Sequence, residues 1–142
     1  RTALDLRWSD TLGQIREAAP DIPITVWCNE DLPLIWSQVI REIAGLELHE
    51  KITGGFDLLA TIMSKEGMQR FRTYLDSHPE MSEIQKRRVI AAFLDKFAID
   101  DEIEEELDMP GWTEELVDEM SDIYDDDMAV IQRIPGVTMI TP

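Results

Sequence analysis

The chain has 142 residues, 44% of them hydrophobic, and a formal net charge of −17. Its length suits a single domain with a real core, and no apolar run approaches the roughly 20 residues that a membrane span needs. The charge opposes nucleic-acid binding, which depends on Lys and Arg side chains that displace counterions from phosphates.

The first predicted helix covers residues 9–19, because apolar side chains recur there at helical spacing and Pro20 follows. These side chains are Leu4, Trp8, Leu12 and Ile15. The apolar run 24–27 then predicts a short buried strand.

A polar turn follows this strand and leads into a second helix. Pro33 suits the first helical turn, and Gly45 suits the position just after the last turn. Because α/β proteins place ligand sites where strands end, Asn29, Glu30 and Asp31 form the candidate structural site, a strand–helix turn. Either carboxylate can cap the helix, which is the favoured interpretation, or act as a base if burial raises its pKa.

Three helices are predicted next. The first covers residues 56–63. Ser64 suits the N-cap of the second, which ends near His78. Ser82 and Gln85 form a capping-box pattern that opens the third.

The C-terminal third is acidic: residues 100–142 hold 15 acidic side chains and one basic side chain, a net charge of −14. Residues 98–111 are predicted to be mostly loop. Thr113 then caps a last long helix that ends before Pro135. Residues 137–140 are predicted either to form a short strand or to tuck against the core.

These elements predict a mainly α-helical fold with one or two short strands. We expect a single domain or domain fragment over 1–142, with a helix–strand–helix unit over 1–48 and a helical part with an acidic tail over 56–142. Because the sequence is already patterned close to Arg1, we expect a piece of a longer protein. The remainder of that protein, or a second copy, would then pair with the strand.

Other groups of polar residues favour structural interpretations. Cys28 stands where a helix N-terminus can activate a thiol, but no His is near it in sequence. The acidic run 118–127 lacks the spacing of a calcium loop, and the Lys86-Arg87-Arg88 triplet is interpreted as a solvated helix face. We therefore predict no catalytic, cofactor-binding or metal-binding residue. A single cysteine fits a reducing compartment, so we expect the cytoplasm.

The order of elements resembles the C-terminal half of the P-loop sulfotransferase-like family, from about Leu6 to Ile134. The matching segments are Asn29-Glu30-Asp31-Leu32, where the family has Tyr-Glu-Asp-Leu; Ile43-Ala44-Gly45-Leu46 at the end of the next helix; and Tyr124-Asp125-Asp126-Asp127 on the last long helix.

The resemblance implies that this chain is the C-terminal part of a P-loop α/β fold. A complete family member would transfer a sulfuryl group from 3′-phosphoadenosine 5′-phosphosulfate to a hydroxyl or an amine. The sequence lacks the family's Gly- and Thr-rich phosphosulfate loop and its segment that holds the 3′-phosphate, so we expect a structural, acceptor-side portion that is inactive alone. The alternative is an acidic helical protein-interaction domain without catalytic activity, which would hold a basic protein partner.

Overall fold

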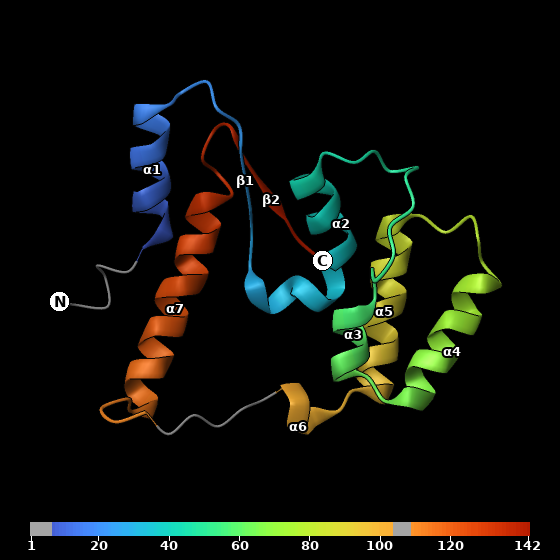
Figure 1. Cartoon of the computed structure of the whole chain (residues 1–142). Helices are drawn as coiled ribbons and strands as arrows, with labels where there is room; N and C mark the ends of the chain where they lie inside the picture. The colour runs from blue at the N-terminus through green and yellow to red at the C-terminus, as the bar shows by residue number, and fades with distance from the viewer. Residues whose placement is uncertain (1–6, 104–108) are drawn as a thin grey trace. The chain divides into compact units, whose positions relative to one another are not determined.

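The computed structural model describes residues 7–103 and 109–142, which are mainly helical (Figure 1). Residue contacts divide the chain into two compact units. Unit 1 holds the described residues up to Val26 and those from Met109 to Met139. Unit 2 holds those from Trp27 to Ile103, together with 140–142.

Unit 1 is built on two helices, α1 (Trp8–Ala18) and α7 (Glu114–Ile131), which pack on each other (Figure 1). The helix predicted over 9–19 is confirmed. The helix–strand–helix unit predicted over 1–48 is not observed as one body, because α1 packs on α7 and belongs to unit 1, whereas the helix after the strand belongs to unit 2.

The apolar stripe predicted for α1 is fully buried at one position. Leu12 is buried, whereas Trp8 is 62% exposed and Ile15 is 44% exposed. The helix that packs most extensively on α1 is α7, and one neighbouring helix covers only a narrow stripe. Leu4 lies outside the described residues.

Two short strands, β1 (Ile24–Trp27) and β2 (Val137–Ile140), pair in parallel and form a two-stranded sheet within the described residues. The amide of Ile24 donates to the carbonyl of Gly136 at 3.1 Å. The predicted strand over 24–27 is confirmed, and residues 137–140 form a strand. Parallel strands need a long crossover connection, and all the helices from α2 to α7 lie between these two.

The helices of unit 2 are α2 (Leu32–Ala44), α3 (Asp57–Ile62), α4 (Lys65–Asp76), α5 (Glu83–Phe97) and α6 (Asp100–Ile103). α4 packs on α5, and α2 packs on α3 and α5. The predicted N-caps are confirmed: the hydroxyl of Ser64 accepts from the amide of Gly67 at 3.1 Å, and Ser82 with Gln85 forms the capping box of α5.

The prediction of a loop over 98–111 is wrong in part, because α6 forms within it. Asp100, Asp101 and Glu102 fill its first turn, where negative charge stabilises the positive end of a helix. The rest of that segment includes residues 104–108, which lie outside the described residues. In the part of the chain that is described, no helix has both the length and the apolarity to cross a membrane.

The main core of unit 2 lies between α3, α4 and α5. Its buried side chains are Leu59, Met63, Met68, Phe71 and Ile90. α4 approaches the end of α5 closely at Gly67, where an added Cβ would lie 2.4 Å from the Cβ of Phe97. A second cluster joins Ile35 and Val39 of α2 to Ile140 of β2.

Candidate functional site

The carboxyl ends of both strands lie in unit 2. Trp27, the last residue of β1, and Ile140, the last residue of β2, pack against the same face of α2. Because the strands are parallel, they end at the same edge of the sheet. This is the edge at which α/β proteins bind ligands.

The three residues predicted for the strand–helix turn form a single 3₁₀ turn, η2 (Asn29–Asp31), between β1 and α2. Asn29 and Glu30 are exposed, and Asp31 is half-buried. The backbone closes the turn, since the amide of Asp31 donates to the carbonyl of Cys28 at 3.1 Å.

The prediction that the Asp31 carboxylate caps α2 is wrong. Asp31 occupies the N-cap position of α2, but its side chain makes no capping hydrogen bond. A capping residue normally has extended backbone angles, which aim its side chain at the second and third helical amides. Asp31 instead has helical angles, φ −84° and ψ −10°, because the 3₁₀ turn runs directly into the helix.

Burial raises the pKa of the Asp31 carboxyl above its usual value of 3.8, and the charge of the adjacent Glu30 raises it further. A raised folded-state pKa means that the ionised carboxyl opposes folding. The stabilising contribution of this group is therefore fully present below its unfolded-state pKa and is lost as the pH rises through its folded-state pKa.

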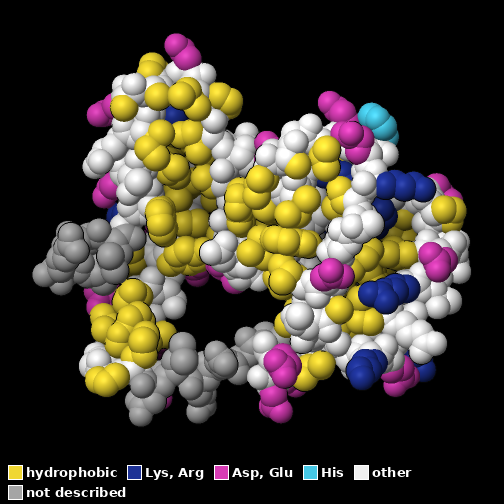
Figure 2. Space-filling view, in the orientation of Figure 1, with side chains coloured by type: hydrophobic (Ala, Val, Ile, Leu, Met, Phe, Trp, Pro, Cys, Tyr) yellow, Lys and Arg dark blue, Asp and Glu magenta, His cyan; other side chains and the backbone are white. Residues whose placement is uncertain are grey.

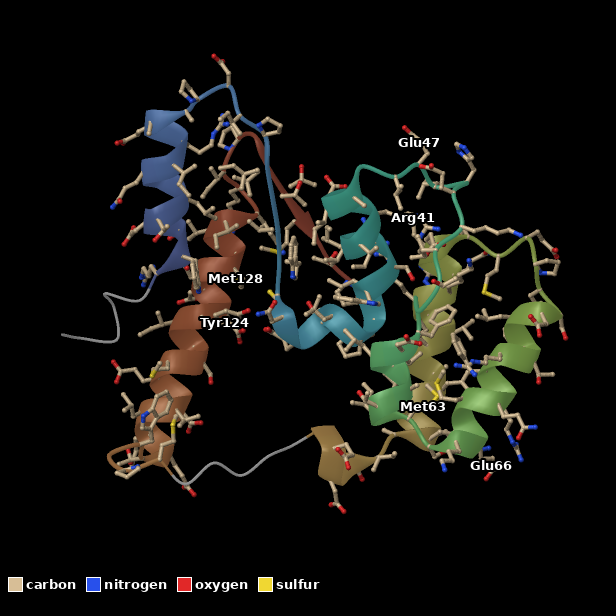
Figure 3. All side chains as sticks on the ribbon, in the orientation of Figure 1. Arg41, Glu47, Met63, Glu66, Tyr124 and Met128 are labelled. Atoms are coloured by element: carbon tan, nitrogen blue, oxygen red, sulfur yellow. The ribbon has the colours of Figure 1, made fainter. Side chains whose placement is uncertain are left out.

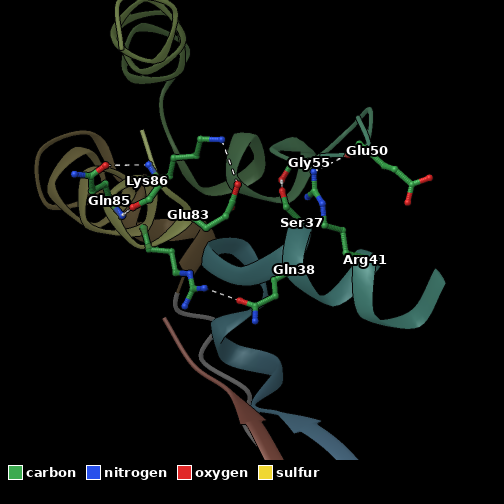
Figure 4. Close-up of polar contacts among 10 residues, drawn as sticks. Ser37, Gln38, Arg41, Glu50, Gly55, Glu83, Gln85 and Lys86 are labelled. Carbon is green, nitrogen blue, oxygen red and sulfur yellow. Dashed lines mark hydrogen bonds and ion pairs between the residues drawn. The ribbon is translucent and has the colours of Figure 1, made fainter. Parts of the chain in front are cut away.

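Arg87 of α5 ties the end of β2 to α2. Its guanidinium donates to the carbonyl of Thr141, directly after β2. It also donates to Oε1 of Gln38 at 2.6 Å, a contact drawn as a dashed line at Gln38 in Figure 4. The interpretation of Lys86-Arg87-Arg88 as a solvated face is therefore wrong for Arg87, which is half-buried, although Arg88 is exposed. Both contacts of Arg87 are charge-assisted hydrogen bonds, which are stronger than those between neutral groups.

A cavity of about 270 Å³ lies in unit 2, between α2, the loop after it, the start of α3, α4 and the start of α5. Its charged lining residues are Arg41, Arg72, Lys86, Asp57 and Glu83. None of the three turn residues lines it. Figure 2 shows Lys and Arg side chains over α4 and α5, and these helices supply two of the three cations.

Cys28 and the two histidines, His49 and His78, do not line this cavity. Cys28 is half-buried, and His49 is exposed. His78 stacks on Tyr74 with ring centroids 4.2 Å apart. Among the described residues, no three His, Cys, Asp or Glu side chains are placed to hold a metal ion.

Asp127 has a structural role that the sequence interpretation missed. It is 1% exposed and accepts hydrogen bonds from the backbone amide of Ser9, at 3.1 Å, and from the Ser9 hydroxyl. Asp127 thus caps α1 from α7, in place of Arg7, which makes no side-chain cap. The signal was its spacing: it lies four residues after Ile123 and four before Ile131, on the buried stripe of α7.

Comparison with known proteins finds no match: no family model fits the chain, and no curated protein or solved structure is significantly similar to it. The resemblance to sulfotransferase-like proteins therefore stays a prediction.

Proposed function

We propose that this chain is the C-terminal, acceptor-side portion of a P-loop sulfotransferase-like protein. The observation that carries the proposal is the parallel pairing of β1 with β2, with the turn Asn29–Asp31 at the carboxyl end of β1 and α2 directly after it. Parallel strands occur mainly in α/β sheets covered by helices on both faces. Such sheets usually have four to six strands, so the proposal places this pair in a larger sheet.

In the proposed reaction, a hydroxyl or amine of the acceptor attacks the sulfur of 3′-phosphoadenosine 5′-phosphosulfate. The bond from sulfur to the bridging phosphate oxygen breaks, 3′-phosphoadenosine 5′-phosphate leaves, and the acceptor loses a proton. Backbone amides of a glycine-rich loop before a helix cradle phosphate in such folds, and this sequence has no such loop. The portion proposed here supplies the wall beside the acceptor and not the donor site. We propose that the complete protein works in the cytoplasm.

The test compares this chain with the complete product of its gene. Calorimetry with 3′-phosphoadenosine 5′-phosphate should show micromolar binding to the complete protein and none to the chain alone. Transfer of radiolabelled sulfate to a panel of hydroxyl and amine acceptors should follow the same pattern. Failure of the complete protein to bind the nucleotide would contradict the proposal. Micromolar binding by the chain alone would show that the donor site had been misplaced.

A second candidate is an acidic interaction domain that holds a basic protein. The observation that favours it is the exposed acidic surface of α7, formed by Asp118, Glu119, Asp122, Asp125 and Asp126. Binding of a lysine-rich peptide that weakens steeply with salt, together with no nucleotide binding by the complete protein, would support this candidate over the first.

A further inference from the structure

We propose that the 270 Å³ cavity of unit 2 binds the oxyanion group of a small ligand, a carboxylate, phosphate or sulfate, through Arg41, Arg72 and Lys86. This inference does not depend on the proposed sulfotransferase relationship. All the lining residues belong to unit 2, and they come from α2, from the loop after it, from α3, from α4 and from α5.

The charge of the lining is the first argument. The chain has a net charge of −17 and only 13 Lys and Arg side chains, yet three of these line one cavity. The lining also holds Asp57 and Glu83, and Glu83 is already paired with Lys86 at 3.2 Å. The lining therefore carries one excess positive charge, which complements an anion.

The hydrogen bonding of Arg41 is the second argument. Its Nη2 donates to the carbonyl of Glu50 at 2.9 Å, which holds the side chain between α2 and the following loop (Figures 3 and 4). Its Nε is buried and makes no hydrogen bond to any of the described residues. Buried donors in native proteins nearly always have a partner, often a water or an ion, and the guanidinium fork matches the oxygen spacing of carboxylate and phosphate.

A hydrogen bond joins the loop that lines the cavity to α2. The hydroxyl of Ser37, one helical turn before Arg41, donates to the carbonyl of Gly55 at 3.4 Å. A Cβ at Gly55 would lie 2.7 Å from that hydroxyl oxygen, so a larger residue there would require the Ser37 side chain to move. The cavity lies just below the usual range for small-molecule sites, so it takes a small anion or the anionic end of a larger ligand.

The test follows the Nε–Hε resonance of Arg41 by nuclear magnetic resonance, assigned with an Arg41→Lys variant. The chain is titrated with inorganic phosphate, sulfate and acetate, against chloride at matched ionic strength. Glycerol phosphate and succinate then show whether an organic anion binds more tightly than a free one. We expect a saturable shift of the Arg41 resonance with at least one oxyanion and none with chloride.

A matched pair of variants tests the location. Arg72→Gln removes an exposed cation of the lining, and Arg88→Gln removes an exposed cation of α5 that does not line the cavity. Loss of one charge-assisted contact should weaken oxyanion binding about three- to tenfold in Arg72→Gln and leave it unchanged in Arg88→Gln. The proposal fails if chloride shifts the Arg41 resonance equally, if no oxyanion shifts it, or if the two variants behave alike.

Discussion

The capping of α1 by Asp127 gives a sharp test of how unit 1 is held together. We consider three variants: Asp127→Ala, Ser9→Ala and the double substitution. Asp126→Ala is the matched control, because it removes the same charge from the same helix at an exposed position. Removing one negative charge lowers the repulsion among the acidic side chains of this chain, and it does so equally in both aspartate variants. The difference between the two variants therefore reports the hydrogen bonds of Asp127.

The expected sizes follow from the two hydrogen bonds that Asp127 accepts from Ser9. A hydrogen bond to a charged group contributes about 1.5–3 kcal/mol. Asp127→Ala removes both bonds and also opens the N-terminus of α1, so we expect a loss of about 3 kcal/mol in the free energy of unfolding. Ser9→Ala keeps the bond from the backbone amide and should lose about 1–2 kcal/mol.

The two substitutions should be non-additive, with a coupling energy of about 1 kcal/mol, since both remove the same hydroxyl contact. Urea unfolding gives the free energies, and hydrogen exchange of the α1 amides shows whether the loss falls on unit 1. Asp126→Ala should change stability by less than about 0.5 kcal/mol. Equal effects of Asp127→Ala and Asp126→Ala, or strict additivity with Ser9→Ala, would refute the reasoning.

Three further substitutions test packing, charge and capping. Gly67→Ala should destabilise the chain by about 1–3 kcal/mol because the new Cβ meets Phe97, whereas Gly13→Ala, with nothing within 4 Å, should stabilise it by up to about 1 kcal/mol; thermal unfolding measures both. Asp31→Asn should raise stability at neutral pH by less than about 1 kcal/mol, and the gain should vanish in urea titrations well below pH 3.8, the usual pKa of the carboxyl. Ser82→Ala should cost about 1 kcal/mol, with faster hydrogen exchange in the first turn of α5.

Each of these has a clear contrary outcome. Gly67→Ala that leaves stability unchanged would show that α4 and α5 lie further apart than in the structure. A gain from Asp31→Asn that persists at low pH would mean that lost charge is not its cause. Full protection of the α5 amides in Ser82→Ala would mean that the capping box does not hold the helix end.

Local features of the fold could be predicted because their signals lie within a few residues. Ser64 and Ser82 each cap a helix by accepting a hydrogen bond from an amide three residues later. The four consecutive residues Ile24–Trp27 predict a strand without reference to any distant part of the sequence. Packing partners are set by contacts distant in sequence. Ser9 and Asp127 are 118 positions apart, so no local pattern could pair α1 with α7.

The candidate site was predictable in position and not in detail. The turn at residues 29–31 follows from the end of an apolar run and from Pro33. The missing cap of Asp31 depends on backbone angles that the residue type does not specify. The cavity around Arg41 combines four helices and a loop, so its cations, Arg72 and Lys86 among them, share no spacing that a sequence motif could express.

The proposed function rests on the parallel pairing of β1 and β2, and nuclear Overhauser contacts between the two strands test it directly. Protons of Ile24 should lie near those of Gly136 and Val137, and protons of Trp27 near those of Ile140. Contacts in the opposite order, with Ile24 near Ile140, or helical contacts within 24–27, would contradict the parallel pair and remove the basis for a sulfotransferase-like fold.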